Sequence, residues 1–103
     1  MAKNGATVVL ASRNNSLLDN LNQEINRYGN SIYIKTDVTN ENDIINLIEH
    51  VKDQFGRIDV LINNAGIAKH VPINEMNSED WDRIINTNLN GVYYGCNYAS
   101  KFM

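Results

Sequence analysis

The sequence has little cysteine or proline and no long apolar run: its 103 residues include one cysteine and one proline. A single cysteine, Cys96, excludes an internal disulfide, and no Cys-x-x-Cys spacing indicates a zinc site. No stretch approaches the roughly 18 apolar residues that are needed to cross a bilayer. The amino terminus shows neither an apolar signal core nor an Arg-rich transit character. We therefore expect a cytoplasmic protein without a membrane partner.

Basic residues are also few, since 9 Lys and Arg face 12 Asp and Glu and give a net charge of −3. No cluster of them provides the positive footprint that nucleic-acid binding requires, so we expect no nucleic-acid partner. Neither His50 nor His70 has a carboxylate or a second histidine at metal-ligand spacing, which predicts surface histidines and no metal. The hydrophobic fraction of 43% is that of an ordinary globular domain.

The hydrophobic pattern alternates between the periods of strands and helices. Short runs of apolar or alternating residues predict strands over residues 7–11, 31–35 and 58–62. Apolar residues at helical spacing predict helices over residues 16–28, 39–55 and 78–103. The first and third strands are nearly all apolar, which is typical of strands buried on both faces of a parallel sheet. We expect the last helix to carry one continuous apolar stripe from Trp81 to Met103.

Capping residues set the expected helix boundaries. Thr39 and Ser78 are the expected N-caps of the second and third helices, each followed by acidic residues near the positive helix end. Gly29 and Gly56 stand where helix C-cap glycines belong. The resulting order, β-α-β-α-β-α, predicts an α/β fold with a doubly wound parallel sheet covered by helices.

Polar and small residues follow each predicted strand. Ser12-Arg13 follows the first, Asp37-Val38 the second, and Asn63-Asn64-Ala65-Gly66 the third. Parallel strands end at the same edge of a sheet, and in open α/β sheets ligands bind at that edge. Small residues such as Ala65 and Gly66 let a ligand approach the backbone closely.

Taken in order, four motifs resemble the short-chain dehydrogenase/reductase family over essentially the whole chain. They are Asn4-Gly5-Ala6, Asp37-Val38, the run from Asp59 to Gly66, and Asn88-Leu89-Asn90-Gly91. The resemblance implies that residues 1–103 form a partial NAD(P)-binding Rossmann domain. It also implies that the first strand with its glycine-rich loop, and the carboxyl-terminal half with the catalytic serine and Tyr-x-x-x-Lys, lie outside this sequence.

The resemblance also implies roles for particular residues. Asp37 would accept a hydrogen bond from the adenine amino group beside the Val38 backbone, and Asn64–Gly66 would line the adenosine ribose. Thr87 would approach the nicotinamide-side ribose through its backbone. Asn88 is similar to the family's catalytic asparagine, which helps to hold a water in the proton relay.

Arg13 bears on the choice of cofactor. In dinucleotide-binding folds an acidic residue after this strand bonds the ribose 2′-hydroxyl, whereas an arginine accommodates a 2′-phosphate. In this sequence Ser12 stands at the position of that acidic residue, and Arg13 is next to it. We therefore expect NADP(H) to be favoured over NAD(H).

Each of these residues also has a purely structural interpretation. Asn88 falls on the apolar stripe and could be a core asparagine bonded to backbone, and Asp37 could serve a turn or helix entry. Arg13 could be a solvated strand-end arginine, and Cys96 is expected to pack within its helix. Tyr98 and Lys101 are three residues apart, not four, so they do not form the family's catalytic pair.

The expected reaction is hydride transfer between a nicotinamide and a small carbonyl or secondary-alcohol substrate, in a parent protein that is a homo-oligomer. One alternative is a non-catalytic, truncated nucleotide-binding remnant. Another is a regulatory module of the flavodoxin-like or receiver type, which would need a phosphate-binding loop or an acidic cluster with a phosphorylatable aspartate after the first strand, and neither is present. In a sheet of order 3-2-1-4-5, the absent strand separates the first two strands here from the third. The isolated chain is therefore not expected to be a stable monomer.

Overall fold

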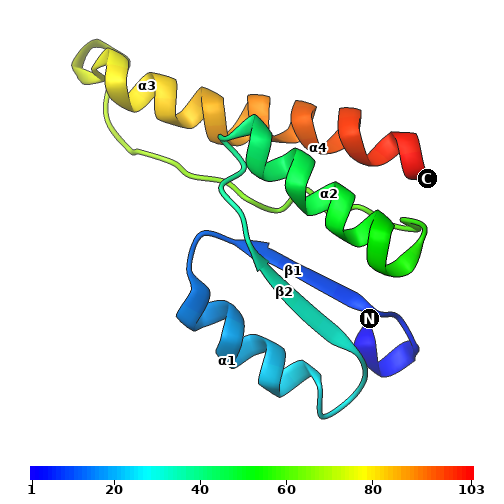
Figure 1. The fold of residues 1–103 in the computed structure, drawn as a ribbon. Coiled ribbons are helices and arrows are strands. Elements are labelled where there is room, and N and C mark those ends of the chain that lie inside the picture. Colours follow the sequence, from blue (N-terminus) through cyan, green and yellow to red (C-terminus); the bar gives the residue numbers. More distant parts are fainter. The chain divides into compact units, whose positions relative to one another are not determined.

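A computed structural model describes residues 1–103 and divides them into two compact units, Met1–Asp37 and Val38–Met103 (Figure 1). The first unit contains the 3-10 turn Ala2–Asn4, β1 (Val8–Ser12), α1 (Asn15–Ile25) and β2 (Ser31–Lys35). The second unit contains α2 (Glu41–Phe55), the 3-10 turn Ile73–Glu75, α3 (Ser78–Ile85), the π-turn Asn86–Asn90, α4 (Gly91–Ala99) and the 3-10 turn Ser100–Phe102. No helix has the length and apolar character that crossing a bilayer requires.

The first unit is a β-α-β motif with a parallel sheet. β1 pairs with β2 in a register that runs from Val8 opposite Ser31 to Ser12 opposite Lys35. α1 connects the strands and buries Leu18, which is 4% exposed. This confirms the predicted α/β order and the bounds of the second strand. The predicted burial of the first strand is wrong, because no residue of β1 is fully buried.

Residues 58–62 do not form the predicted third strand. The sheet consists of β1 and β2 only, and the amide of Ile58 donates instead to the carbonyl of Phe102 at 3.2 Å. Val60 and Ile62 are 61% and 64% exposed. An apolar run becomes a strand only where a neighbouring strand supplies ladder hydrogen bonds.

The helices begin at asparagine caps. The side chains of Asn14, Asn40 and Asn77 accept hydrogen bonds from backbone amides in the first turns of α1, α2 and α3. The predicted caps Thr39 and Ser78 are therefore wrong, each by one residue. Both stand next to an asparagine whose extended backbone suits the cap position, and local sequence does not decide between two adjacent capping residues.

The two glycines expected to end helices behave differently. Gly56 ends α2 in the left-handed conformation with φ 79°, as predicted. Gly29 is not the cap of α1, because the helix ends at Ile25 and Asn26 takes the cap position. Gly29 is instead a point of close approach: a Cβ there would lie 2.5 Å from the carbonyl oxygen of Ala2.

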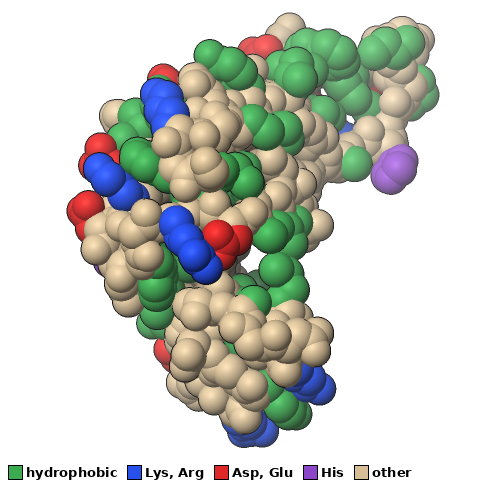
Figure 2. All heavy atoms as spheres, turned by 90° about the vertical axis from the view of Figure 1, so that its right-hand side faces the viewer, with side chains coloured by type: hydrophobic (Ala, Val, Ile, Leu, Met, Phe, Trp, Pro, Cys, Tyr) green, Lys and Arg blue, Asp and Glu red, His purple; other side chains and the backbone are tan.

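The last predicted helix is interrupted by the π-turn, so its apolar stripe does not run unbroken. In α4 the buried face consists of small residues, Gly91, Gly95 and Ala99, spaced four apart. Ala99 packs in the core with Ile44 and Ile48 of α2. Before the π-turn Trp81 is 50% exposed, and after α4 Met103 is 62% exposed. Hydrophobic side chains are accordingly visible on the surface (Figure 2).

Candidate functional site

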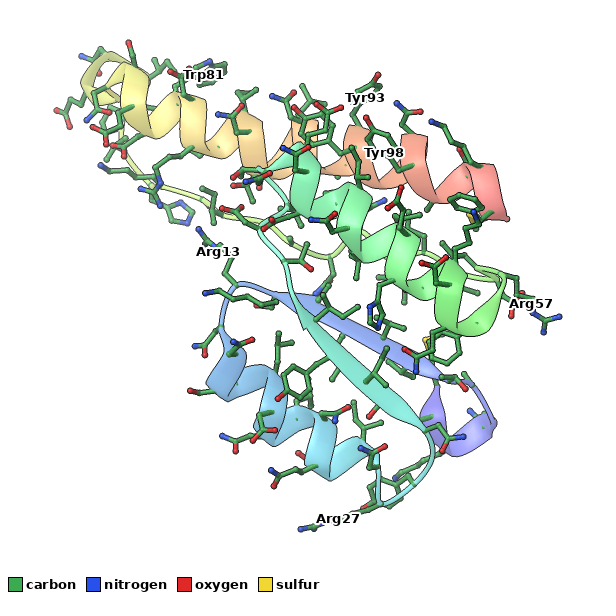
Figure 3. The ribbon with its side chains drawn as sticks, in the orientation of Figure 1. Arg13, Arg27, Arg57, Trp81, Tyr93 and Tyr98 are labelled. Atoms are coloured by element: carbon green, nitrogen blue, oxygen red, sulfur yellow. The ribbon has the colours of Figure 1, made fainter.

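The carboxyl ends of β1 and β2 bring together the predicted residues of the first unit. Arg13 directly follows β1, and its exposed side chain extends from that edge (Figure 3). Thr36 directly follows β2 and is 1% exposed. Its backbone amide donates a hydrogen bond to the Ser12 carbonyl at 2.8 Å. This bond fixes the strand ends, so Asp37 follows from a rigid position and is half-buried.

Lys35 lies at the same edge and was missed by the sequence interpretation. It is opposite Ser12 in the parallel register, and its side chain is exposed. Lys35 ends β2 and Arg13 directly follows β1, so two exposed cations lie at the carboxyl ends of these strands. The signal that could have found Lys35 was its place as the last residue of the predicted second strand.

In the second unit, the side chain of Asn88 binds both backbone groups of Ile67. Its Nδ2 donates to the Ile67 carbonyl at 2.8 Å, and its Oδ1 accepts from the Ile67 amide at 2.9 Å. The π-turn that contains Asn88 is thus joined to the loop that follows Gly66. Asn88 is exposed, so its expected place on a buried apolar stripe is wrong; its bonds to backbone are those of the alternative, structural interpretation.

All four residues of the segment Asn63–Gly66 are exposed, and the side chain of Asn63 is also held by a contact with α4. Asn63 Nδ2 donates a hydrogen bond to the Cys96 sulfur at 3.5 Å. The Oδ1 atom of Asn63 is so close to Gly95 that an added Cβ there would lie 2.6 Å from it. Asn64, Ala65 and Gly66 are exposed. A ligand could therefore reach the backbone of these three residues, while the contact of Asn63 with Cys96 attaches the segment to α4.

Val38 and Thr87 are the remaining predicted residues of this unit. Val38 packs against α4 at Gly91, where an added Cβ would come within 3.1 Å of the valine side chain. Thr87 lies in the π-turn and is 8% exposed. The structure therefore holds Val38, Thr87 and Asn88 along the π-turn and the start of α4.

Tyr98 and Lys101 are not arranged as a catalytic tyrosine–lysine pair. The Tyr98 hydroxyl donates to the Glu41 carboxylate, and the Lys101 ammonium lies over the Tyr98 ring, 4.9 Å from its centroid. The hydrogen bond to Glu41 and then burial raise the pKa of the Tyr98 phenol. A catalytic tyrosine requires a lowered pKa, which supports the exclusion of this pair. Cys96, expected to pack within its helix, is exposed instead.

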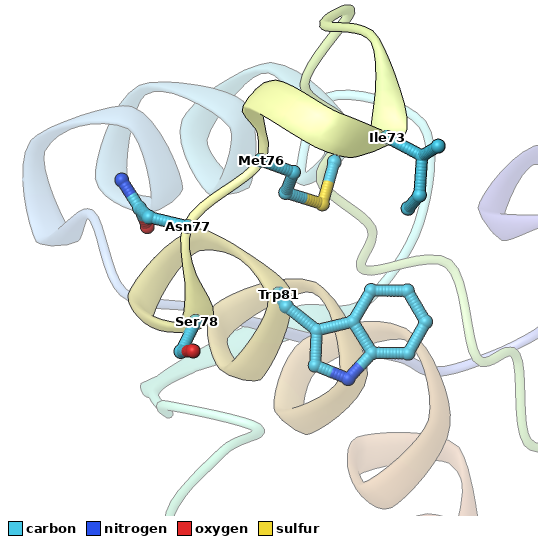
Figure 4. Close-up of a pocket in the computed structure, with 5 residues that line it drawn as sticks. All are labelled: Ile73, Met76, Asn77, Ser78 and Trp81. Carbon is cyan, nitrogen blue, oxygen red and sulfur yellow. The ribbon is translucent and has the colours of Figure 1, made fainter.

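Two cavities lie in the second unit. The first, of about 180 Å³, is lined by Ile73, Met76, Asn77, Ser78 and Trp81 (Figure 4). The second, of about 220 Å³, adjoins the loop held by Asn88 and is lined by Ile67, Ala68, Lys69, Asp80, Arg83 and Ile84. Lys69, Asp80 and Arg83 form a cluster that the sequence interpretation did not single out, because residues 69 and 80 show no local pattern that relates them.

Comparison with known proteins places these features in one family. The sequence model described as short chain dehydrogenase matches residues 1–103. 3beta-hydroxysteroid dehydrogenase 2 of Eggerthella lenta is 36% identical over 100 residues, which cover 95% of this chain and 38% of that protein. The chain thus spans less than half the length of this relative.

Solved structures show the same fold. An NAD⁺-bound xylitol dehydrogenase superposes with a TM-score of 0.94 at 27% identity, covering 99% of this chain and 40% of that one. An alcohol dehydrogenase from the archaeon Thermococcus sibiricus, complexed with 5-hydroxy-NADP, has a TM-score of 0.94 at 23% identity, covering 98% and 44%. The alternating elements are thus part of a doubly wound Rossmann fold, and, with a family match across every residue, the chain belongs to the short-chain dehydrogenase family.

Proposed function

We propose that this chain is the adenosine-binding part of an NAD(P)-dependent oxidoreductase, which transfers hydride between a nicotinamide and a small carbonyl or secondary alcohol. The observation that carries the proposal is the reciprocal Asn88–Ile67 pair directly after Asn63–Gly66. It joins two segments of the family resemblance in one place. In this proposal, residues 1–103 belong to one nucleotide-binding domain, and the whole protein is a cytoplasmic homo-oligomer.

The residues present fit an adenosine. Asn64–Gly66 expose backbone without large side chains, since Ala65 carries only a methyl group and Gly66 none, so a ribose can approach closely. Asp37 would accept from the adenine amino group, and Val38 would present its backbone beside it. The bound dinucleotide supplies hydride chemistry at its nicotinamide ring, and the protein supplies binding and orientation. Thr87 would hold the nicotinamide-side ribose.

NADP(H) is the favoured cofactor in this proposal. Arg13 follows β1 where an acidic residue would bond a ribose 2′-hydroxyl, and exposed Lys35 adds a second cation at the strand ends. A guanidinium pairs with a phosphate through two parallel hydrogen bonds. The relatives do not decide the choice, because one structure holds NAD⁺ and another an NADP derivative.

The cofactor proposal is tested by binding to the full-length protein. Arg13→Ala should weaken NADPH binding by about ten- to a hundredfold, because one charged hydrogen-bonded pair contributes about 1.5–3 kcal/mol. NADH binding should change less than about twofold. The exposed Arg27, at the turn after α1, offers a matched control in Arg27→Ala. Tighter binding of NADH than NADPH to the unmodified protein would contradict the preference.

Asn88 is the proposed catalytic residue of this chain, holding a water of the proton relay. Asn88→Ala removes both hydrogen bonds to Ile67, so NADPH-dependent reduction of a carbonyl substrate should fall by about a hundredfold. Asn90→Ala is the control, since it removes only the bond from Asn90 Nδ2 to Asn86 Oδ1 in the same π-turn. Cofactor binding without turnover in the unmodified protein would support the non-catalytic alternative instead.

A further inference from the structure

The loop after Gly66 is attached to the α3 side at a second point besides Asn88. Lys69, two residues beyond Ile67, forms an ion pair with Asp80 in the first turn of α3. The guanidinium of Arg83 lies 3.7 Å from the other carboxylate oxygen of Asp80. One carboxylate therefore faces two cations, one from the loop and one from its own helix.

Asp80 is more shielded from solvent than a typical surface carboxylate. Its side chain is 13% exposed, whereas those of Lys69 and Arg83 are 48% and 64% exposed. Its amide donates to the Asn77 side chain at 2.8 Å, so the N-cap fixes its backbone as well. Exposed ion pairs contribute little to stability, but a shielded carboxylate left without its cation is costly.

The two attachment points flank the cavity of about 220 Å³. Ile67 and Lys69 contribute to its loop wall, and Asp80 and Arg83 to its helix wall. A loop held at one residue could still rotate about that point. Attachment at both Ile67 and Lys69 restricts this rotation.

We propose that Asp80 is a positioning residue, which holds Lys69 and, together with Asn88, fixes residues 67–69 as one wall of the substrate-binding cavity. The assignment of the cavity to substrate rests on the proposed function above. The positioning itself rests on the ion pairs alone. Two measurements therefore separate the two claims.

The first measurement is hydrogen exchange of the Ile67 amide in the full-length protein, which needs no turnover. Asp80→Asn should accelerate this exchange by about tenfold or more, because the loop is then held at one point. Asp82→Asn, an exposed acid on the same helix, should change it less than about twofold. Asp80→Glu, which keeps the charge, should restore most of the protection. Unchanged exchange in Asp80→Asn would overturn the proposal.

The second measurement is steady-state kinetics of the same variants with NADPH and a carbonyl substrate. In Asp80→Asn the KM for the carbonyl should rise about tenfold, while kcat and the KM for NADPH change less than about threefold. A loss confined to kcat would overturn the substrate-wall assignment. If the unmodified protein shows no turnover, the proposed function fails, and the exchange result still decides whether Asp80 positions the loop.

Discussion

Two stretches of similar sequence, β1 and residues 58–62, have different structures in this chain. Both are short runs of apolar residues, and both were predicted to be strands. β1 pairs along its length with β2, whereas Val60 and Ile62 are exposed and outside any sheet. The difference shows that apolar composition alone does not produce a strand, because a strand also needs a neighbour that supplies ladder hydrogen bonds. In the sheet order that the family resemblance implies, the neighbour of residues 58–62 would be a strand other than β1 and β2.

The sharpest way to break this comparison is Ile62→Lys in two contexts. In the 103-residue chain, Ile62 is 64% exposed, so lysine should leave folding unchanged and reduce aggregation, as measured by light scattering. In the full-length protein, we propose that residues 58–62 form a buried strand of the sheet, as the family resemblance implies. There the same charge should destabilise by several kcal/mol, about 3 or more, in urea unfolding.

Equal effects in the two contexts would contradict this reasoning. Val60→Lys is a second variant of the same kind, since Val60 is 61% exposed here. Arg57→Ala is the control, because its pair with Asp59 is exposed on both sides and should contribute little in either context.

The same distinction explains how much of the fold could be predicted from the sequence. The β-α-β order of the first unit, the bounds of β2 and the end of α2 at Gly56 depend on local pattern, and they are confirmed. The missing strand ladder, the close approach at Gly29 and the Lys69–Asp80 pair depend on residues that meet only after folding. Local sequence contains no signal for such contacts.

The candidate site divides in the same way. The motif at Asn63–Gly66 and the residue Asn88 could be found from sequence because a family resemblance names them. The partner of Asn88 could not, since Ile67 is bound through its backbone and any residue type would offer the same groups. The π-turn at Asn86–Asn90 was equally hidden, because its residues continue a helical pattern.

A smaller effect is expected at two glycines that differ in what their neighbours can do. At Gly29 an added Cβ would meet a backbone oxygen, that of Ala2, at 2.5 Å, so Gly29→Ala should destabilise by about 1–3 kcal/mol. At Gly95 it would meet the side-chain oxygen of Asn63 at 2.6 Å, and that side chain can turn away. Alanine also favours a helix interior by about 0.5–1 kcal/mol.

In Gly95→Ala the crowding of Asn63 lowers the free energy of unfolding, and the helix preference of alanine raises it. The two effects oppose each other, so the net change should be less than about 1 kcal/mol. Urea unfolding of both variants in the full-length protein measures the difference. A larger loss at Gly95 than at Gly29 would show that Asn63 is held in place by more than Cys96, and the proposed support for residues 64–66 would be more rigid than its hydrogen bond to Cys96 indicates.

The smallest expected effect concerns two tyrosines, one in each unit, that face carboxylates. Asp19 raises the pKa of Tyr33 through its charge and a hydrogen bond, and Glu41 raises that of Tyr98 through a hydrogen bond. A raised pKa means that folding favours the neutral phenol, so this stabilisation is complete below the ordinary tyrosine pKa of about 10. It is lost as the pH rises through the higher pKa of the folded state.

Absorbance titration of the phenolates tests this in Glu41→Gln and Asp19→Asn. Each variant should bring one tyrosine back toward the ordinary range, and Tyr98→Phe identifies which transition belongs to Tyr98. Because Glu41 is on α2 and Tyr98 on α4, a shift of the Tyr98 transition in Glu41→Gln shows that this contact between the two helices forms in solution. A Tyr98 transition that does not move would mean that the hydroxyl has left Glu41, and the argument that this tyrosine is unsuited to catalysis would lose its basis.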